Sequence, residues 1–282
     1  MRRFGLNGAT TGQTALLTDL AVAREAGFAA LEIRDVKLES YLAQGGSLTD
    51  LAGAFAAAGV IPLSLNALEQ ATPSTGSARA AVLERSRTVC AWAAALRCPY
   101  VVAVPGPAAG LDGGAVRRAS VEALRAMAAV AREHGVSIGF EFLGSPDCSV
   151  RTLAAAREIV EEVHDPQVGL VIDAFHYYVG GSTLQMLGGL DPHRLFIVHL
   201  DDAEDRPREE LSDAHRLLPG EGVIPLRELI HALDGLGYDG VYSVELFRPE
   251  YWAWDPFDLA RASRESLDAL FAGAAEREVR RP

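Results

Sequence analysis

Four apolar segments in the second half of the chain each end at a side chain that can bind a metal ion. The segments cover residues 136–141, 168–173, 195–199 and 240–247, and their β-branched and aromatic residues predict buried strands. The side chains are Glu141, Asp173, His199 and Glu245. Each one alone fits a structural polar residue at a strand end, but a buried charge is costly without a partner. Their recurrence predicts that parallel strands bring all four together.

Strand-like and helix-like segments alternate along the whole chain. Further strands are predicted at 4–7, 31–34, 61–66 and 100–104. Helices are predicted at 14–26, 48–58, 79–96, 115–134, 152–163, 183–190, 226–236 and 259–271. Eight such strands predict a (β/α)8 TIM barrel, with residues 1–282 as a single domain. An open doubly wound sheet is the alternative, but the turn at 5–10 lacks the glycine-rich phosphate-binding pattern.

Composition excludes several classes of function. The net charge of −12 argues against a nucleic-acid partner, and no apolar run is long enough to span a membrane. Three scattered cysteines, Cys90, Cys98 and Cys148, indicate a reducing, cytoplasmic location rather than a disulfide scaffold. Lys37 is the only lysine, which leaves Schiff-base chemistry without a good candidate.

The four strand-end side chains form an oxygen-rich set of ligands. In a barrel the carboxyl ends of all strands open on one face, where active sites are built. Three carboxylates and one imidazole suit a hard or borderline divalent ion. We expect one such ion, Mn²⁺ first, with Zn²⁺, Co²⁺ and Mg²⁺ as alternatives, and no organic cofactor. Four protein ligands leave coordination positions open for two substrate oxygens.

Residues beyond the strand ends are candidates for contact with a substrate. His176, three residues after Asp173, is placed to bond a substrate hydroxyl or carbonyl group; the alternative is a solvent-facing residue at a helix start. In the long polar loop after 195–199, Arg206 or Arg216 either holds a hydroxylated substrate or pairs with neighbouring acids. The aromatic cluster around Trp252 either covers the pocket mouth or packs against a partner subunit.

Several strings of sequence resemble one family over nearly the full length. The most specific is Ser-Val-Glu-Leu-Phe-Arg-Pro-Glu-Tyr at 243–251; others lie at 7–11, 31–34, 65–68, 101–105 and 168–176. They are similar to the xylose-isomerase-like TIM barrels, which include sugar isomerases, sugar epimerases and endonuclease IV. Within that group the chain looks closest to the inosose (2-keto-myo-inositol) isomerases. The family's metal ligands fall on Glu141, Asp173, His199 and Glu245.

The resemblance implies a reaction and roles for the candidate residues. The expected activity moves the ketone of an inosose to the adjacent carbon through a cis-enediolate, with Glu141 and Glu245 transferring protons. His176 is expected to orient the substrate, with Asn66, Glu32, Arg206 and Trp252 as weaker contacts. The expected partner is a small polyhydroxylated ketone, with no nucleic acid and no membrane, and a homo-oligomer is allowed.

Rival functions share the same fold and metal site. The enediolate can instead expel a β-hydroxyl group, as in an inosose dehydratase. Sugar 3-epimerases of the group place an arginine at a fixed step after the metal-binding histidine; here that step falls on Asp205, with Arg206 one residue beyond. Phosphodiester hydrolysis needs more histidines at strand ends and a basic groove. A non-enzymatic sugar-binding barrel leaves the four converging ligands unexplained.

Overall fold

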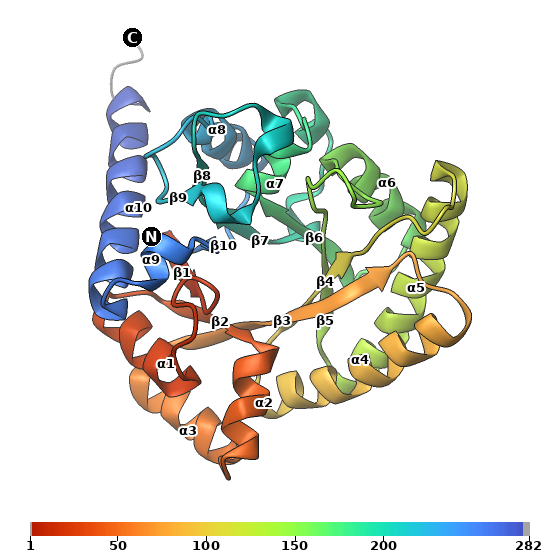
Figure 1. The fold of residues 1–282 in the computed structure, drawn as a ribbon, viewed down its shortest axis with the longest axis horizontal. Coiled ribbons are helices and arrows are strands. Elements are labelled where there is room, and N and C mark those ends of the chain that lie inside the picture. Colours follow the sequence, from red (N-terminus) through yellow and green to blue (C-terminus); the bar gives the residue numbers. More distant parts are fainter. Residues whose placement is uncertain (1, 279–282) are drawn as a thin grey trace.

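The computed structural model describes residues 2–278, which form one closed barrel of parallel strands surrounded by helices (Figure 1). The barrel strands are β1 (Arg3–Asn7), β2 (Ala30–Arg34), β3 (Ile61–Thr72), β4 (Tyr100–Pro105), β5 (Ser137–Glu141), β6 (Val168–Asp173), β7 (Leu195–Leu200) and β10 (Val241–Val244). Pairing of β1 with both β2 and β10 closes the barrel. The predicted fold is confirmed. Met1 and residues 279–282 of the predicted domain lie outside the described residues.

Helices pack around the outside of the barrel between successive strands. They are α1 (Leu16–Glu25), α3 (Leu48–Ala58), α4 (Gly76–Leu96), α5 (Gly113–His134), α6 (Leu153–Val163), α8 (Leu226–Leu236) and α10 (Pro256–Glu278). The predicted bounds of α3 and α8 are confirmed. Helix α3 begins where the Ser47 side chain accepts a hydrogen bond from the backbone N–H of Asp50, and it ends at Gly59 in the left-handed conformation.

Two short helices differ from the sequence prediction. The helix predicted at 183–190 is wrong: α7 (Ala174–Val179) instead follows β6 directly, and only a 3₁₀ turn, η1 (Leu184–Leu187), lies in the predicted stretch. Glycine pairs at 180–181 and 188–189 interrupt this region, with Gly181 and Gly189 at positive φ. Helix α2 (Asp35–Ala43) was not predicted, because its apolar residues do not share one face: Val36 is 58% exposed.

Strand lengths also differ at two places near the barrel mouth. Strand β3 continues six residues beyond the predicted 61–66, and its register with β4 shifts twice in that extension. Strand β10 is shorter than predicted, so that Glu245 lies one residue past its end. A small antiparallel pair, β8 (Asp202–Ala203) with β9 (Arg216–Leu217), forms in the long loop after β7.

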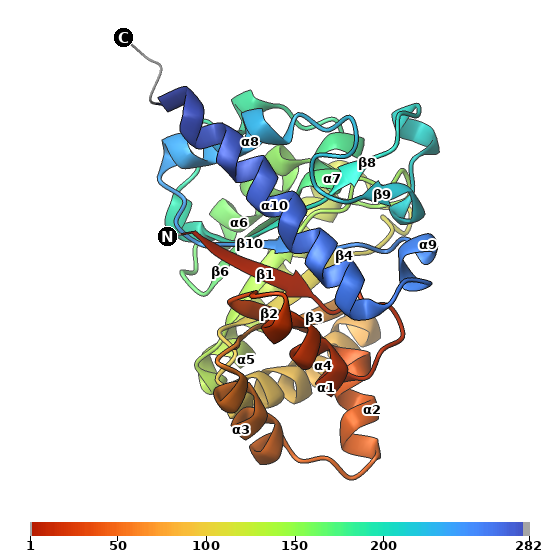
Figure 2. The same cartoon turned by 90° about the vertical axis from the view of Figure 1, so that its left-hand side faces the viewer.

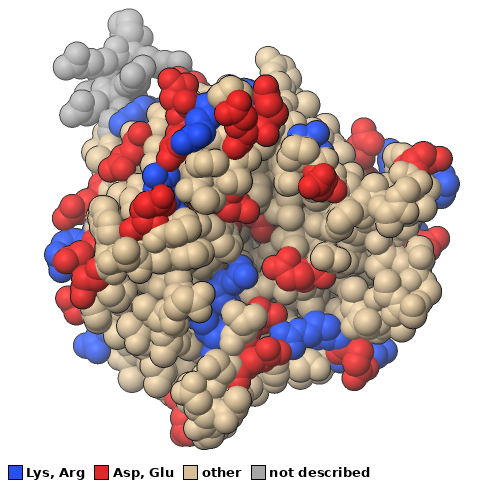
Figure 3. All heavy atoms as spheres, in the orientation of Figure 1, with Lys and Arg blue, Asp and Glu red and all other residues tan. Residues whose placement is uncertain are grey.

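All barrel strands end on the same face of the molecule. In the side view, β1 points toward the side that also carries α9 (Pro249–Trp252), β9 and α2 (Figure 2). That face is hollowed at its centre, with acidic and basic side chains around the hollow (Figure 3). The polar residues that end the strands therefore gather at the floor of one depression. Among the described residues, no helix is long and apolar enough to cross a membrane.

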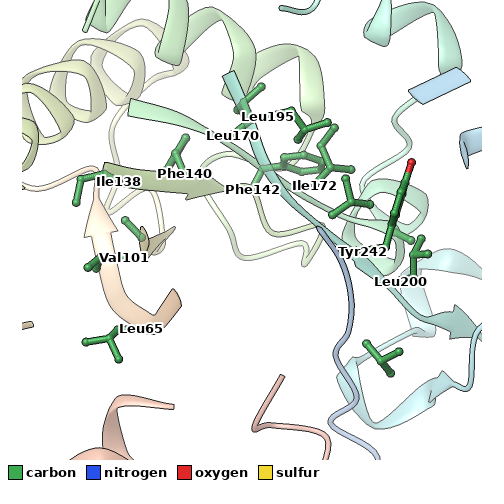
Figure 4. Close-up of a cluster of buried hydrophobic side chains, with 14 of the residues drawn as sticks. Leu65, Val101, Ile138, Phe140, Phe142, Leu170, Ile172, Leu195, Leu200 and Tyr242 are labelled. Atoms are coloured by element: carbon green, nitrogen blue, oxygen red, sulfur yellow. The ribbon is translucent and has the colours of Figure 1, made fainter. Parts of the chain in front are cut away.

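The strands alternate their side chains between two apolar clusters. Ile138, Phe140, Leu170 and Ile172 face the surrounding helices (Figure 4). A second, smaller cluster fills the barrel interior and consists of Ala30, Leu63, Ala67, Val102, Val104, Val171, Ile197 and Val241. Because side chains alternate along a strand, the residue two positions after inward-facing Val171 also points inward. That residue is Asp173, and the same alternation directs His199 and Glu245 into the barrel after Ile197 and Val241.

One buried ion pair secures the loop between β1 and α1, which borders the mouth. The Lys37 ammonium group on α2 lies 2.7 Å from Asp19 Oδ2 and also donates to the carbonyl oxygen of Gly8, 2.8 Å away. The side chains of Lys37 and Asp19 are only 9% and 1% exposed. Burial raises the pKa of Asp19, while Lys37 opposes that rise. Lys37, which lies on α2, thus connects that helix with α1 and with the loop that joins β1 to α1.

We expect Lys37→Met to lower the free energy of unfolding by about 3–5 kcal/mol, because it leaves the Asp19 carboxylate buried without its partner. Chemical denaturation measures this change. The double variant Lys37→Met/Asp19→Asn should recover part of the loss. Arg261→Met, which breaks the exposed Arg261–Asp258 pair, serves as the control and should change stability little. Equal effects for the buried and exposed pairs would contradict this account.

Candidate active site

The four predicted ligands meet at the floor of the hollow. Glu141, Asp173, His199 and Glu245 each offer a ligand atom, and these atoms lie within 4.8 Å of one another. Strand pairing contributes directly, because Asp173 and His199 are register partners on β6 and β7. Asp173 and His199 have no exposed surface, whereas each of the two glutamates keeps 4%. The glutamates therefore form the side of the cluster that faces the mouth.

The two ring nitrogens of His199 face different surroundings. Nδ1 lies 3.1 Å from Glu141 Oε1, 3.3 Å from Glu245 Oε2 and 3.8 Å from Asp173 Oδ2. Nε2 lies 3.1 Å from the carboxylate of Glu32, which comes from β2 across the barrel. Burial alone would lower the pKa of His199, but the carboxylates of Glu32, Glu245 and Glu141 hold it well above its usual value.

The two glutamates differ in their further partners. Glu245 Oε1 accepts a hydrogen bond of 2.8 Å from the Asn7 side-chain amide at the end of β1. For Glu141, burial raises the pKa to about 8; the neighbouring carboxylates of Glu245 and Asp173 add to the rise, and His199 opposes it. Glu141 is therefore a carboxyl group that can hold or release a proton near neutral pH.

Arg216 on β9 places its guanidinium group inside the site. Its side chain is fully buried, and Nη1 lies 2.6 Å from Asp173 Oδ2, also contacting Asp201 and the carbonyl oxygen of Glu245. Nη2 donates to Asp213 Oδ1 at 3.0 Å. Despite burial, Arg216 lowers the pKa of Asp173, whereas burial and the nearby Asp173 raise that of Asp201. Of the two roles predicted for Arg216, pairing with neighbouring acids is confirmed.

His176 lies beside Arg216 at the first turn of α7. Its backbone N–H donates to Asp173 Oδ1 at 2.7 Å, and its Nε2 lies 3.1 Å from Arg216 Nη2. Because a guanidinium group only donates, Nε2 must accept and the proton must be on Nδ1. Burial lowers the pKa of His176, which favours this neutral ring. Nδ1 has no hydrogen-bond partner among the described residues, so its N–H can meet a substrate oxygen. His176 is 7% exposed, so the alternative of a solvent-facing residue is wrong.

The weaker predicted contacts occupy different positions. Glu32 and Asn66 lie below the cluster, 0% and 1% exposed, and Asn66 Nδ2 is 3.3 Å from Glu32 Oε2. Trp252 on α9 is 37% exposed and donates from its ring N–H to the carbonyl oxygen of Ala9, so it lies on the loop after β1. Arg206 is 46% exposed and pairs with Glu204 at 2.6 Å. Arg206 contacts a residue of the outer loop. The arginine of this loop that enters the buried cluster is Arg216.

Sequence reasoning missed three polar residues of the site. Asn7 is the last residue of β1, and the predicted ligands likewise lie at or near the ends of their strands. The same pattern could therefore have identified Asn7. Ser64 donates to Glu32 Oε2 at 2.7 Å from the middle of β3, where a small polar residue gives no distinctive signal. Asp201, one residue past β7, belongs to an acidic stretch that looks solvent-exposed in sequence, yet its side chain is fully buried.

The charges of the cluster fit a divalent cation. Five carboxylates in and around the ligand cluster are at most 4% exposed: Glu32, Glu141, Asp173, Asp201 and Glu245. Among the described residues, the buried groups that offset them are the Arg216 guanidinium and the His199 ring. Buried like charges repel strongly unless compensated. Carboxylate oxygens and an imidazole nitrogen are accepted ligands of Mg²⁺, Mn²⁺ and Zn²⁺, so the residues present fit such an ion.

Comparison with known proteins places this geometry in a family. Residues 20–271 match the model of the xylose isomerase-like TIM barrel. The chain is 35% identical over 263 residues to an inosose isomerase of Halalkalibacterium halodurans, covering 92% of this chain and 93% of that protein. It is 37% identical over 249 residues to an inosose isomerase of Bacillus subtilis, covering 87% and 89%.

Among solved structures, a 1.8 Å crystal structure of an IolI protein with a zinc atom is similar to this one over nearly its whole length. The TM-score is 0.93 at 34% identity, and the match covers 96% of this chain and 99% of that one. The resemblance inferred from the sequence is confirmed. The chain belongs to the xylose isomerase-like TIM barrel family.

Proposed function

We propose that the protein is an inosose isomerase, which moves a ketone between adjacent carbons of a polyhydroxylated ring. The observation that carries the proposal is the position of Glu141 and Glu245, the two members of the ligand cluster that keep exposed surface toward the mouth. Two carboxylates at the accessible side of a buried site suit a reaction made of two proton transfers. The full-length similarity to inosose isomerases supports the choice of substrate.

Two glutamates that start in opposite protonation states carry out the reaction, and each returns to its starting state by proton exchange with water. One glutamate removes the proton from the hydroxyl-bearing carbon next to the ketone, which leaves an enediolate. The other glutamate returns a proton to the former carbonyl carbon, and the hydroxyl proton moves to the former carbonyl oxygen. The ketone has then shifted by one carbon without any oxidant or reductant.

Other residues of the site orient the substrate and keep the carboxylates in place. His176 presents its Nδ1–H to a substrate oxygen, since its Nε2 is occupied by Arg216. Asn7 holds Glu245 through a hydrogen bond of 2.8 Å, and this fixes the direction of the other carboxylate oxygen. Substrate contact by Asn66, Arg206 and Trp252 remains a prediction.

We further propose that Glu141, Asp173, His199 and Glu245 hold one divalent ion, with Mn²⁺ as the expected metal. When bound, such an ion supplies Lewis-acid stabilisation of the negative charge that develops on the substrate oxygens. The excess of buried carboxylates in the site and the zinc atom in the IolI structure support a divalent ion. The expected cytoplasmic location is supported by the three unpaired cysteines, which suit a reducing compartment.

The first test of the function is incubation of Mn²⁺-loaded protein with 2-keto-myo-inositol in D₂O, followed by proton NMR and ultraviolet absorbance. We expect a new ketone that carries deuterium at the carbon next to the carbonyl group. Growth of strong absorbance from a conjugated dione would instead identify a dehydratase. Unchanged substrate with an occupied metal site would contradict the proposed substrate.

We expect Glu141→Gln and Glu245→Gln each to lower kcat by about 10²–10⁴-fold, because an amide cannot accept the carbon-bound proton. Initial rates of ketone formation measure the effect, and thermal unfolding verifies the fold. Glu250→Gln, which changes a 67% exposed side chain in the short helix α9 that follows Glu245, is the matched control and should keep the native rate. A near-native rate for either site variant would remove that glutamate from proton transfer.

Metal binding should stabilise the folded protein. At a metal concentration 100 times the Kd, we expect a gain of about 2.7 kcal/mol over the chelator-treated protein, because the ion binds only the folded cluster. Thermal or chemical unfolding with added Mn²⁺ or Zn²⁺ measures the gain. Asp173→Asn should abolish it, since the amide removes one anionic ligand. No metal-dependent stabilisation of the native protein would contradict the proposed metal site.

A further inference from the structure

Glu32 occupies a position that substrate contact does not explain. It lies near the end of β2, and its carboxylate crosses the barrel interior to His199 on β7, which is 167 residues away in sequence. The side chains of both residues are completely buried, whereas the mouth-facing glutamates keep exposed surface. Since His199 separates Glu32 from the ligand cluster, Glu32 acts on the site through that ring.

Several donors hold the Glu32 carboxylate in place. Ser64 donates to Oε2 at 2.7 Å, and the amide of Asn66 approaches the same oxygen at 3.3 Å. Both donors come from β3, the strand paired with β2, and Ser64 is the register partner of Glu32. A carboxylate that accepts several hydrogen bonds stays ionised despite burial. Glu32 therefore presents a fixed acceptor to the His199 ring.

A metal ion bound at Nδ1 would select one tautomer of the His199 ring. Nδ1 faces the three carboxylates of the ligand cluster at 3.1, 3.3 and 3.8 Å, and Nε2 faces Glu32 at 3.1 Å. A neutral imidazole donates a lone pair from one nitrogen and carries its proton on the other. If Nδ1 binds a metal ion, Nε2 must carry the proton and needs an acceptor. Among the described contacts of Nε2, that acceptor is Glu32.

We propose that Glu32 is a positioning residue that keeps the His199 proton on Nε2 and turns Nδ1 toward the metal site. This inference rests on the metal site of the proposed function. A carboxylate can accept a hydrogen bond from the N–H of a metal-binding histidine, which orients the ring and increases its basicity. Loss of such a partner typically weakens metal affinity by about 10–100-fold. Glu32 thus contributes to metal affinity without touching the metal ion or the substrate.

The first experiment measures the Zn²⁺ affinity of wild-type protein, Glu32→Gln and Glu32→Ala by competition with a chelator, and the thermal midpoint of each metal-free protein. We expect Glu32→Ala to bind Zn²⁺ about 10–100-fold more weakly. Glu32→Gln retains an acceptor oxygen and should lose less affinity. Glu39→Gln, which changes an exposed glutamate on α2, is the control and should bind as the wild type does.

The second experiment starts with wild-type protein, so its first result does not depend on whether a variant folds. In protein labelled with ¹⁵N-histidine and loaded with ¹¹³Cd²⁺, we expect cadmium–nitrogen coupling at Nδ1 of His199 and a proton on Nε2. In Zn²⁺-loaded Glu32→Gln the Nε2–H resonance should shift toward the position of a weaker hydrogen bond. A structural role alone would not produce this spectroscopic change.

The outcomes separate this inference from the proposed function. Wild-type affinity in a folded Glu32→Ala protein, or cadmium coupling at Nε2, would overturn the role of Glu32 and leave the metal site intact. Wild-type protein that binds neither Zn²⁺ nor Cd²⁺ would overturn the metal site and the role of Glu32 together. Weaker binding by Glu32→Ala with an unchanged metal-free midpoint would support the role.

Discussion

Repulsion among buried carboxylates is the interaction on which the organisation of this site depends. Glu141, Asp173 and Glu245 converge on the His199 ring, with Glu32 behind it, in a region almost without solvent. In a medium of low dielectric, carboxylates this close together move apart or take up protons unless a positive charge lies beside them. The raised pKa of Glu141 and Asp201 reflects this burial and crowding. The closed barrel holds these acids together because each lies at or near the end of a paired strand.

Arg216 and His199 meet the acids from two sides. Arg216 contacts Asp173 and Asp201 from the loop after β7, and His199 lies between Glu32 and the three ligand carboxylates. Both positive groups are fully buried, so their attraction to the acids is little screened. Arg216 lowers the pKa of Asp173, whereas burial and the neighbouring carboxylates raise that of Glu141.

The ligand cluster alone does not choose among the reactions that an enediolate can follow. Proton return to the adjacent carbon gives an isomer, whereas loss of a β-hydroxyl group gives an unsaturated product. The choice depends on which substrate oxygens are held and which are free to leave. In this protein the groups above the cluster are His176 and the loop that carries Arg216 and Asp213. Under the proposed function, we expect these residues to decide between the isomer and the unsaturated product.

The ligand quartet and the order of strands could be read from the sequence because both are local patterns. An apolar strand that ends on Asp173 or His199 is visible within six residues, and repeated alternation with helices predicts a barrel. The helix predicted at 183–190 was wrong because glycine pairs interrupt a pattern that otherwise resembles a helix. The extension of β3 depends on pairing with β4, which is not encoded in β3 alone.

Contacts between distant segments could be known only once the chain was folded. Arg206 and Arg216 lie in one polar loop and look equivalent in sequence, yet the pairing of β9 with β8 buries Arg216 while Arg206 stays at the surface. Glu32 looks like a residue of the pocket wall until closure of the barrel brings it to Nε2 of His199. Local patterns determine which residues end a strand; barrel closure determines which of their atoms meet, because it joins strands that are far apart in the chain.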